Sequence, residues 1–391
     1  MITCVIGGNA GSEGKGKIAG YLAQANDYNY AIDNFMTNTG HTYQDSSIGT
    51  VVVQQLPISL VNKQTSLLIG PGAAITPAVL FSEILKYKEM LGCRTIYIHP
   101  NAVVISAKHR HCEEDTLRSG STFKGCGAAS AAKIMRREML FGDFWKVLCL
   151  KFGGSYELPI VFSSEYDDLN YCTTSADFKV LSRHIQVIDT LEILTNAIDN
   201  GDNILVEGSQ GSDLDINYGL AYPFTTSRQC TAGQAIADCG LSPCLNYEVI
   251  MVIRPYPIRI SNAPALLNND VSTVYTGDYA GSEELSWEII RDRCGAPKDH
   301  DLTEMSTVTK KPRRVFEMNW ERLKYVTKLN RPSYIALNFA QYIDWGAYKC
   351  CVYDKLPQTV KNYVERIQQV TGVPVKLIGT GPDNNDIVVI R

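Results

Sequence analysis

The sequence predicts an α/β protein with a large, mostly parallel central sheet flanked by helices, and with a phosphate-binding loop directly after the first strand. Two observations support this prediction. Short β-branched runs alternate with amphipathic helical stretches and Gly/Pro turns along all 391 residues, which is the pattern of strand–helix–strand units. The first of these runs leads into a turn rich in glycine and lysine and then into a helical stretch, an arrangement that favours phosphate binding.

The individual elements follow from the same patterns. Strands are expected over residues 2–7, 30–35, 95–99, 203–208, 248–253, 334–339 and 375–379. The clearest helix is expected over 77–91, with Thr76 as N-cap and Pro77 at the first helical position. Further helices are expected over 130–140, 183–198, 319–329 and 357–370. Because no linker, charge run or repeat divides the chain, we expect a single domain over residues 1–391 with inserted helical and loop regions.

Composition excludes several classes of protein. Hydrophobic residues make up 45% of the chain and charged residues 20%, which is typical of a globular protein with a sizeable core. The net charge of -4 argues against nucleic acid as a partner. No stretch approaches the roughly 18 apolar residues of a membrane span, and the N-terminus runs into Gly and Asn rather than an apolar leader. We therefore expect a cytoplasmic protein with no membrane partner.

The twelve cysteines contain no CxxC pair, so we expect free thiols rather than a disulfide framework or a zinc site. One local cluster, His109, His111, Cys112 and Glu113, has no second pair of ligands at zinc spacing. We expect it to form a solvated loop.

The first strand is followed by Gly7-Gly8-Asn9-Ala10-Gly11-Ser12-Glu13-Gly14-Lys15-Gly16-Lys17. Glycines let the backbone approach phosphate oxygens, the N–H groups converge at a helix N-terminus, and lysine adds positive charge. Ile18 stands where a Walker A loop has its magnesium-binding Ser or Thr. The segment is therefore a related phosphate loop, and a small-molecule kinase is disfavoured.

Several blocks resemble, in order along the chain, the motifs of adenylosuccinate synthetases. The loop Gly11–Ile18 resembles G-D-E-G-K-G-K-I, with Ser12 in place of aspartate. The other blocks are Asn38-Thr39-Gly40-His41-Thr42, Ile69-Gly70-Pro71-Gly72, Gly120-Ser121-Thr122 with the helix after it, Val206-Glu207-Gly208-Ser209-Gln210-Gly211, Thr307-Val308-Thr309 with Pro312-Arg313-Arg314, and Gly379-Thr380-Gly381-Pro382-Asp383. They span nearly the whole chain, which makes coincidence remote.

The resemblance implies an activity. Family members phosphorylate the 6-oxygen of a purine nucleotide and displace that phosphate with the amino group of L-aspartate. The catalytic residues would be Ser12, Lys15 and His41, with His41 as acid or hydrogen-bond donor at the phosphoryl oxygen. Mg²⁺ would be the cofactor, and Ser12 and the Gly40 carbonyl would be the groups that contact it.

The resemblance also assigns binding residues. The nucleotide substrate would contact Ser12, Asn38, Thr122, Arg136, Gln210 and Thr226, with Arg136 reaching the site of the neighbouring subunit in a homodimer. Aspartate would contact Thr307, Val308, Thr309, Lys311 and Arg313. The phosphoryl donor would contact Gly14, Lys15, Gly16, Gly40, His41, Thr42, Asn338, Gln341, Gly379 and Gly381.

Three departures from the family pattern bear on the substrates. Serine at position 12 is a poor base but is smaller than aspartate, which leaves room for a 2-amino purine. The family recognises the guanine of GTP with the motif T-K-x-D, and this chain has Asn338-Phe339-Ala340-Gln341 at that place. An amide side chain can both donate to and accept from the edge of adenine, and Phe339 could stack on the base. Lys310 and Lys311 replace a glycine and an arginine, and lysine cannot form a bidentate fork to the ribose.

These departures resemble a bacteriophage branch of the family, whose members make N6-succino-2-amino-2′-deoxyadenylate from dGMP, L-aspartate and ATP or dATP. On this interpretation the group that accepts the N1 proton is unassigned: Glu13, a phosphate oxygen or water are the candidates. Two alternatives stay open, an ordinary adenylosuccinate synthetase that uses IMP and GTP, and a nucleotide-binding protein that has lost catalysis.

Overall fold

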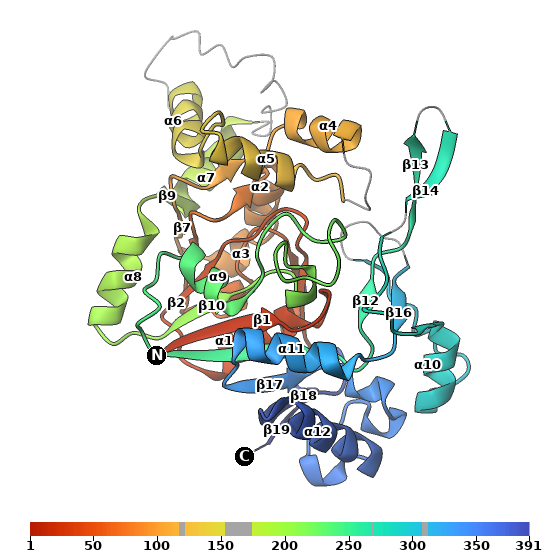
Figure 1. Cartoon of the computed structure of the whole chain (residues 1–391). Helices are drawn as coiled ribbons and strands as arrows, with labels where there is room; N and C mark the ends of the chain where they lie inside the picture. Colours follow the sequence, from red (N-terminus) through yellow and green to blue (C-terminus); the bar gives the residue numbers. More distant parts are fainter. Residues whose placement is uncertain (117–121, 153–173, 268–269, 275, 307–311, 391) are drawn as a thin grey trace.

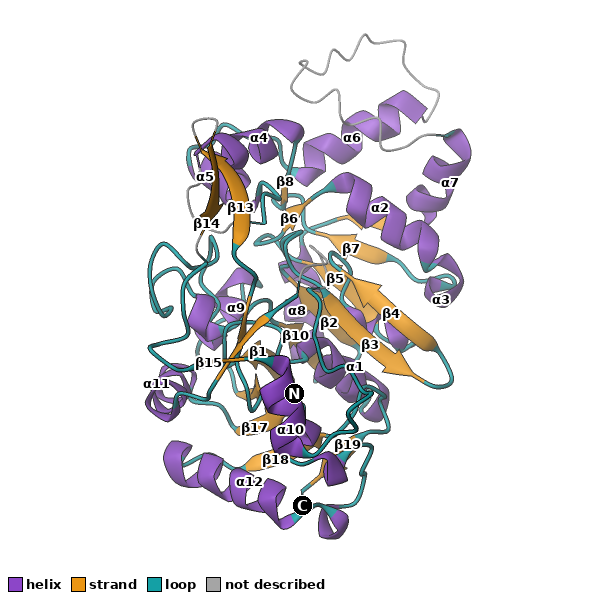
Figure 2. Cartoon of the chain, turned by 90° about the vertical axis from the view of Figure 1, so that its right-hand side faces the viewer, coloured by secondary structure: helices purple, strands orange, loops and turns teal. Residues whose placement is uncertain are grey.

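The computed structural model describes residues 1–116, 122–152, 174–267, 270–274, 276–306 and 312–390. A ten-stranded sheet crosses the molecule (Figures 1 and 2) in the order β19-β18-β17-β11-β1-β10-β2-β5-β7-β9. All neighbours in it run parallel except β18 and β19. Its strands are β1 Ile2–Gly7, β2 Tyr30–Asp33, β5 Ser66–Ile69, β7 Ile96–Ile98, β9 Ile185–Val187, β10 Ile204–Glu207, β11 Tyr247–Ile253, β17 Tyr334–Leu337, β18 Val375–Gly379 and β19 Ile387–Val389. The predicted fold class is confirmed.

Helices cover both faces of this sheet, and each face has its own apolar core. One core packs the sheet against α1, α2, α6 and α7, and the other packs it against α8, α9, α11 and α12. The helices are α1 Lys15–Ala25, α2 Pro77–Lys86, α3 Lys88–Leu91, α4 Ala107–Thr116, α5 Cys126–Ile134, α6 Phe141–Phe152, α7 Ser175–His184, α8 Thr190–Asp199, α9 Ala232–Asp238, α10 Trp287–Cys294, α11 Trp320–Asn330 and α12 Gln358–Thr371. Within the described ranges, no helix combines the length and the apolar character needed to cross a bilayer.

Smaller sheets lie beside the main one. They pair β3 His41–Asp45 with β4 Gly49–Val53, β6 Ala74–Ile75 with β8 Val103–Val104, and β13 Ala263–Leu267 with β14 Asp270–Val274, while β16 Arg314–Phe316 lies between β12 Ile258–Arg259 and β15 Glu284–Leu285. The β13–β14 hairpin projects from the body of the molecule toward the end that carries α4 and α5 (Figures 1 and 2).

Three predicted helices differ from those observed. The helix expected over 77–91 is interrupted at Tyr87. The helix expected over 130–140 begins earlier, at Cys126, because Gly125 adopts a left-handed conformation before it and Glu113 accepts from the N–H groups of Gly125 and Gly127.

The helix expected over 183–198 is instead the end of α7, the edge strand β9 and α8. Asp189 caps α8 by accepting from the N–H of Leu191. The expected loop around His109 is also wrong: it is helix α4, in which His109 is buried and lies 2.9 Å from Glu138.

Candidate active site

The carboxyl ends of the central parallel strands meet at one edge of the sheet, and the loops that follow them carry the predicted residues. Ser12 follows β1, Gln210 follows β10, Asn38 follows β2 and Asn338 follows β17. This edge is where parallel sheets bind ligands. A cavity of about 720 Å³ opens there, a size that accommodates nucleotide-sized molecules.

Many of the predicted residues line this cavity. They are Ser12, Gly14, Lys15, Gly16, Asn38, Gly40, His41, Thr42, Thr122, Gln210, Thr226 and Arg313. Residues that are far apart in the sequence are in contact here: the amide nitrogen of Asn38 lies 3.4 Å from the hydroxyl of Thr226. Thr307, Val308, Thr309, Lys310 and Lys311 lie outside the described residues. The cavity therefore gathers motifs from the whole length of the sequence.

The two lysines of the phosphate loop point to different places. Lys15 lines the cavity and donates to Glu13 at 2.8 Å. Lys17 is buried and donates to the carbonyls of Gly381 and Asp386, at 2.5 and 2.8 Å. Burial lowers the pKa of Lys17 to about 8. Lys17 therefore ties α1 to the segment after β18, and Lys15 is the lysine that faces a ligand.

Glu13 is fully buried beneath the loop. One of its carboxylate oxygens accepts from the N–H groups of Asn9 and Gly11, at 3.1 and 2.8 Å, and the other accepts from Lys15. Glu13 does not line the cavity. Both carboxylate oxygens therefore hold the phosphate loop and Lys15.

His41 is the first residue of β3 and is 5% exposed. Its ring packs edge-on against Phe35, with the centroids 4.3 Å apart. Neither ring nitrogen has a hydrogen-bond partner among the described residues. Burial, with a smaller contribution from Lys15, lowers the pKa of His41 to about 3. A neutral imidazole with unpaired nitrogens at a cavity wall is suited to receive a polar ligand.

Arg313 also presents unused donors to the cavity. Its Nε and Nη1 atoms are buried and lack partners within the part of the chain that the structure describes. Burial lowers the pKa of Arg313. Because buried guanidinium N–H groups without acceptors are costly, these two atoms indicate an anionic ligand.

Asn338 and Gln341 are both buried, and neither lines the cavity. The amide nitrogen of Asn338 donates to the carbonyls of Glu13 and Gly14, at 2.8 and 3.1 Å. A side chain at Gly14 would meet this amide, since its Cβ would lie 2.6 Å from the nitrogen. Asn338 is therefore a clamp on the phosphate loop, and its amide nitrogen is not available to read a base.

The remaining predicted residues lie at the periphery. Gly379 ends β18, Gly381 binds Lys17 through its carbonyl, and neither lines the cavity. Arg136 is exposed, with φ of 58° just after α5, and does not line the cavity of its own chain.

The sequence prediction did not assign Glu304, Glu113 or Arg254 to the site, and it named Glu113 only in the local cluster around His109. Glu304 and Glu113 line the cavity, and Arg254 pairs with Glu304 through bonds of 3.0 and 2.6 Å. None of the three belongs to a recognisable motif. One signal was available for Arg254, because it directly follows the predicted strand 248–253 at the ligand-binding edge of the sheet.

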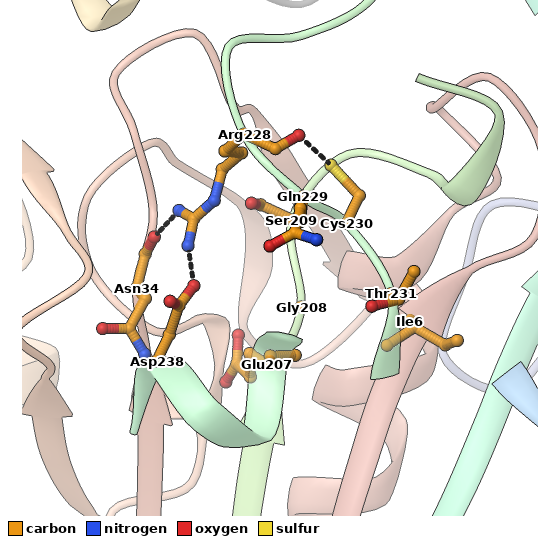
Figure 3. A pocket seen from close by; sticks show the side chains of 11 residues that line it. Ile6, Asn34, Glu207, Gly208, Ser209, Arg228, Gln229, Cys230, Thr231 and Asp238 are labelled. Atoms are coloured by element: carbon orange, nitrogen blue, oxygen red, sulfur yellow. Dashed lines mark hydrogen bonds and ion pairs between the residues drawn. The ribbon is translucent and has the colours of Figure 1, made fainter. Parts of the chain in front are cut away.

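A second, smaller hollow of about 20 Å³ lies at the end of β10 (Figure 3). Arg228 bridges the carbonyl of Asn34 and the carboxylate of Asp238 there. The hollow has room for about one water molecule. The larger cavity is therefore the candidate for nucleotide binding.

A phosphate loop at the edge of a parallel sheet, opening on a cavity that carries a neutral histidine and cationic side chains, defines a nucleotide-dependent enzyme that acts on anionic substrates. The family model for adenylosuccinate synthetase matches residues 4–344 and 344–388. The chain therefore belongs to the adenylosuccinate synthetase family and is a ligase that forms a carbon–nitrogen bond.

Individual relatives divide between two kinds of enzyme. The N6-succino-2-amino-2′-deoxyadenylate synthase of Salmonella phage PMBT28 is 30% identical, over 98% of this chain and 96% of that protein. The adenylosuccinate synthetase of Thermococcus onnurineus (strain NA1) is 28% identical, over 98% of this chain and 97% of that protein.

Two solved structures are similar to the whole chain. The succinoaminodeoxyadenylate synthetase (PurZ) of cyanophage S-2L, bound to dGMP and to dATP as an energy donor, superposes with a TM-score of 0.75 at 27% identity, over 99% of this chain and 95% of that one. Fully ligated adenylosuccinate synthetase from Plasmodium falciparum has a TM-score of 0.76 at 21% identity, over 100% and 99% of the two chains, and supports the fold alone.

Proposed function

We propose that the protein joins L-aspartate to C6 of dGMP, using ATP or dATP, to give N6-succino-2-amino-2′-deoxyadenylate for the synthesis of DNA containing 2-aminoadenine. The observation that carries the proposal is Ser12, a small neutral side chain at the cavity wall where the family motif has aspartate. The serine leaves space for the 2-amino group that distinguishes guanine from hypoxanthine. Similarity to the two phage enzymes supports the same substrate.

The reaction would proceed through a 6-phosphoryl intermediate. The 6-oxygen of the nucleotide attacks the γ-phosphorus of the donor as the N1 proton leaves, and the bond from that phosphorus to the leaving nucleoside diphosphate breaks. Lys15 would contact the transferring phosphoryl group, and His41 would donate a hydrogen bond to the phosphoryl oxygen. Because the neutral imidazole has one N–H donor and both its nitrogens lack described partners, it can take this role without giving up another bond.

The aspartate amine would then attack C6 and displace phosphate. Arg313 would hold a carboxylate of aspartate through the donors that are unpaired within the described chain. Since Glu13 is buried beneath the loop, a phosphate oxygen and a water molecule are the remaining candidates for accepting the N1 proton.

The site also fits magnesium that arrives bound to the nucleotide. The Gly40 carbonyl and the Ser12 hydroxyl offer neutral oxygens, and within the described residues no group of three or more His, Cys, Asp and Glu side chains is placed to hold a metal ion. Mg²⁺ commonly binds substrate phosphates with few protein ligands. When bound, it would neutralise charge on the β- and γ-phosphate oxygens.

A homodimer would complete the nucleotide site. Arg136 is exposed and lies outside its own cavity, and it would reach the nucleotide phosphate in the partner's site. The neighbouring apolar side chains Ile134 and Met135 are 80% and 56% exposed. We expect a sedimentation experiment to give a dimer in the presence of nucleotide, and Arg136→Ala to raise KM for the nucleotide.

The alternative is an ordinary adenylosuccinate synthetase that acts on IMP with GTP, which the similarity to the archaeal enzymes favours. A first test measures donor consumption with and without aspartate. Consumption that requires both aspartate and a purine monophosphate supports the ligase. Consumption without aspartate would indicate a kinase or a hydrolase, and binding with no turnover would indicate a protein that has lost catalysis.

A further inference from the structure

Arg254 is a buried side chain that touches three parts of the cavity wall. It follows β11 and is 0% exposed. Its Nη1 atom donates to the carbonyl of Ser12 at 3.0 Å, and Nη1 and Nη2 donate to the two carboxylate oxygens of Glu304 at 3.0 and 2.6 Å. The guanidinium carbon lies 4.2 Å from the ring centroid of Phe339. Ser12, Glu304 and Phe339 all line the cavity, whereas Arg254 does not.

The backbone of Ser12 needs such a support. Its φ is 58°, in the left-handed region that residues with a side chain rarely adopt. A conformation of this kind persists only where the surrounding structure fixes it. The Arg254 guanidinium holds the Ser12 carbonyl, and with it the peptide plane that follows Ser12, so it supports the backbone from which the Ser12 side chain projects.

The positive charge of Arg254 is balanced by the carboxylate of Glu304. Burial alone would lower the pKa of Arg254, but the Glu304 carboxylate outweighs this effect and raises it. Burial would likewise raise the pKa of Glu304, and Arg254 reverses the effect and lowers it. The planar fork binds both carboxylate oxygens and the Ser12 carbonyl at once, which a lysine ammonium cannot do in the same geometry.

We propose that Arg254 is a positioning residue that orients the Ser12 side chain and thereby sets the preference of the enzyme between dGMP and IMP. It acts through Ser12 and does not touch the nucleotide. The inference rests on the role given to Ser12 in the proposed function.

The test compares Arg254→Lys with the wild type in kcat/KM for dGMP and for IMP. We expect the preference for dGMP to fall about tenfold, equivalent to about 1.4 kcal/mol. In a Ser12→Ala background the same substitution should leave the ratio unchanged, because no hydroxyl remains to be oriented. If Arg254 only stabilised the fold, Arg254→Lys would lower Tm and slow both reactions equally, and an unchanged ratio would overturn the proposal.

Arg228→Lys is the matched control. Arg228 also pairs with a carboxylate, that of Asp238, but it lies at the smaller hollow (Figure 3). Its substitution should leave the ratio between the nucleotides unchanged. If Arg254→Lys does not fold, Glu304→Gln weakens the same cluster without removing Arg254, and an unchanged ratio in that variant would also overturn the proposal.

The wild-type ratio separates this inference from the proposed function. A wild type that prefers IMP contradicts the proposed function, but the role of Arg254 is then read from the same experiment. In that case Arg254→Lys must still reduce the preference between dGMP and IMP, so that their kcat/KM values become more nearly equal. It must do so only in the protein that keeps Ser12. A ratio that moves equally with and without the Ser12 hydroxyl contradicts the role of Arg254 whichever nucleotide is preferred.

Discussion

The side-chain nitrogen of Lys15 lies 2.8 Å from a carboxylate oxygen of Glu13, and both side chains are buried within the phosphate loop. The other carboxylate oxygen holds the N–H groups of Asn9 and Gly11. One carboxylate therefore fixes both the backbone of the loop and the lysine that faces the cavity.

Replacing Glu13 should test this relationship. Glu13→Gln presents an amide N–H₂ to either the backbone N–H groups or the Lys15 ammonium, so a donor faces a donor. Breaking a buried charge pair in this way should lower the free energy of unfolding by about 3 kcal/mol. Urea denaturation measures the change, with the exposed Glu89→Gln as control. A variant as stable as the wild type would show that the pair does not support the loop.

The two loop lysines should respond differently to substitution. Lys15→Met should lower kcat at least about 100-fold, because a charge at the transferring phosphoryl group is lost. Lys17→Met leaves two carbonyls without their donor and should cost about 2 kcal/mol of stability, while turnover at a temperature below unfolding is largely kept. Steady-state kinetics and thermal unfolding of both variants measure this. Equal losses of kcat would contradict the assignment.

His41 should make stability depend on pH in the acid range. Its pKa in the fold is about 3, below the ordinary 6.5, so the unfolded chain binds more protons between these values. The contribution of His41 is therefore present above pH 6.5 and is lost as pH falls toward 3, by up to about 1.4 kcal/mol per unit. His41→Asn should flatten the decline in free energy of unfolding between pH 6.5 and 4.5. Parallel curves for variant and wild type would place the pKa of His41 near its ordinary value.

Asn338 and Gln341 are matched amides with different expected roles. Asn338→Ala removes the donor to two phosphate-loop carbonyls and should lower kcat/KM about tenfold with ATP, dATP and GTP alike. Gln341→Ala should instead change the ratio between ATP and GTP. Gln341 lies behind the cavity wall, but its Oε1 atom is buried without a hydrogen-bond partner among the described residues, which makes its amide the candidate left for reading adenine. A changed ratio in the Asn338 variant would contradict its role as a clamp.

The sequence predicted several of the loops that line the cavity, because motif blocks that follow parallel strands converge at one edge of the sheet. It could not predict the direction of each side chain. Lys15 and Lys17 are two residues apart and point to different partners, and Asn338 turns toward the phosphate loop. These directions depend on tertiary neighbours that the local pattern does not contain.

The fold shows the same limit. Strand 2–7 and strand 375–379 were predicted to the residue because each is a short run rich in β-branched and other apolar residues that ends in glycine. Strand β9 lies within the segment that was predicted to be a helix over 183–198. Its three residues between two helices fit either a helical or a strand periodicity, and only their pairing with β7 makes them a strand.

The central claim is the identity of the substrates, and a product assay by mass spectrometry tests it most directly. Aspartate and magnesium are supplied with every pairing of dGMP, GMP or IMP with ATP, dATP or GTP. We predict a succinyl adduct of dGMP with ATP or dATP as donor. An adduct formed only from IMP with GTP would contradict the account and show that the enzyme is an ordinary adenylosuccinate synthetase.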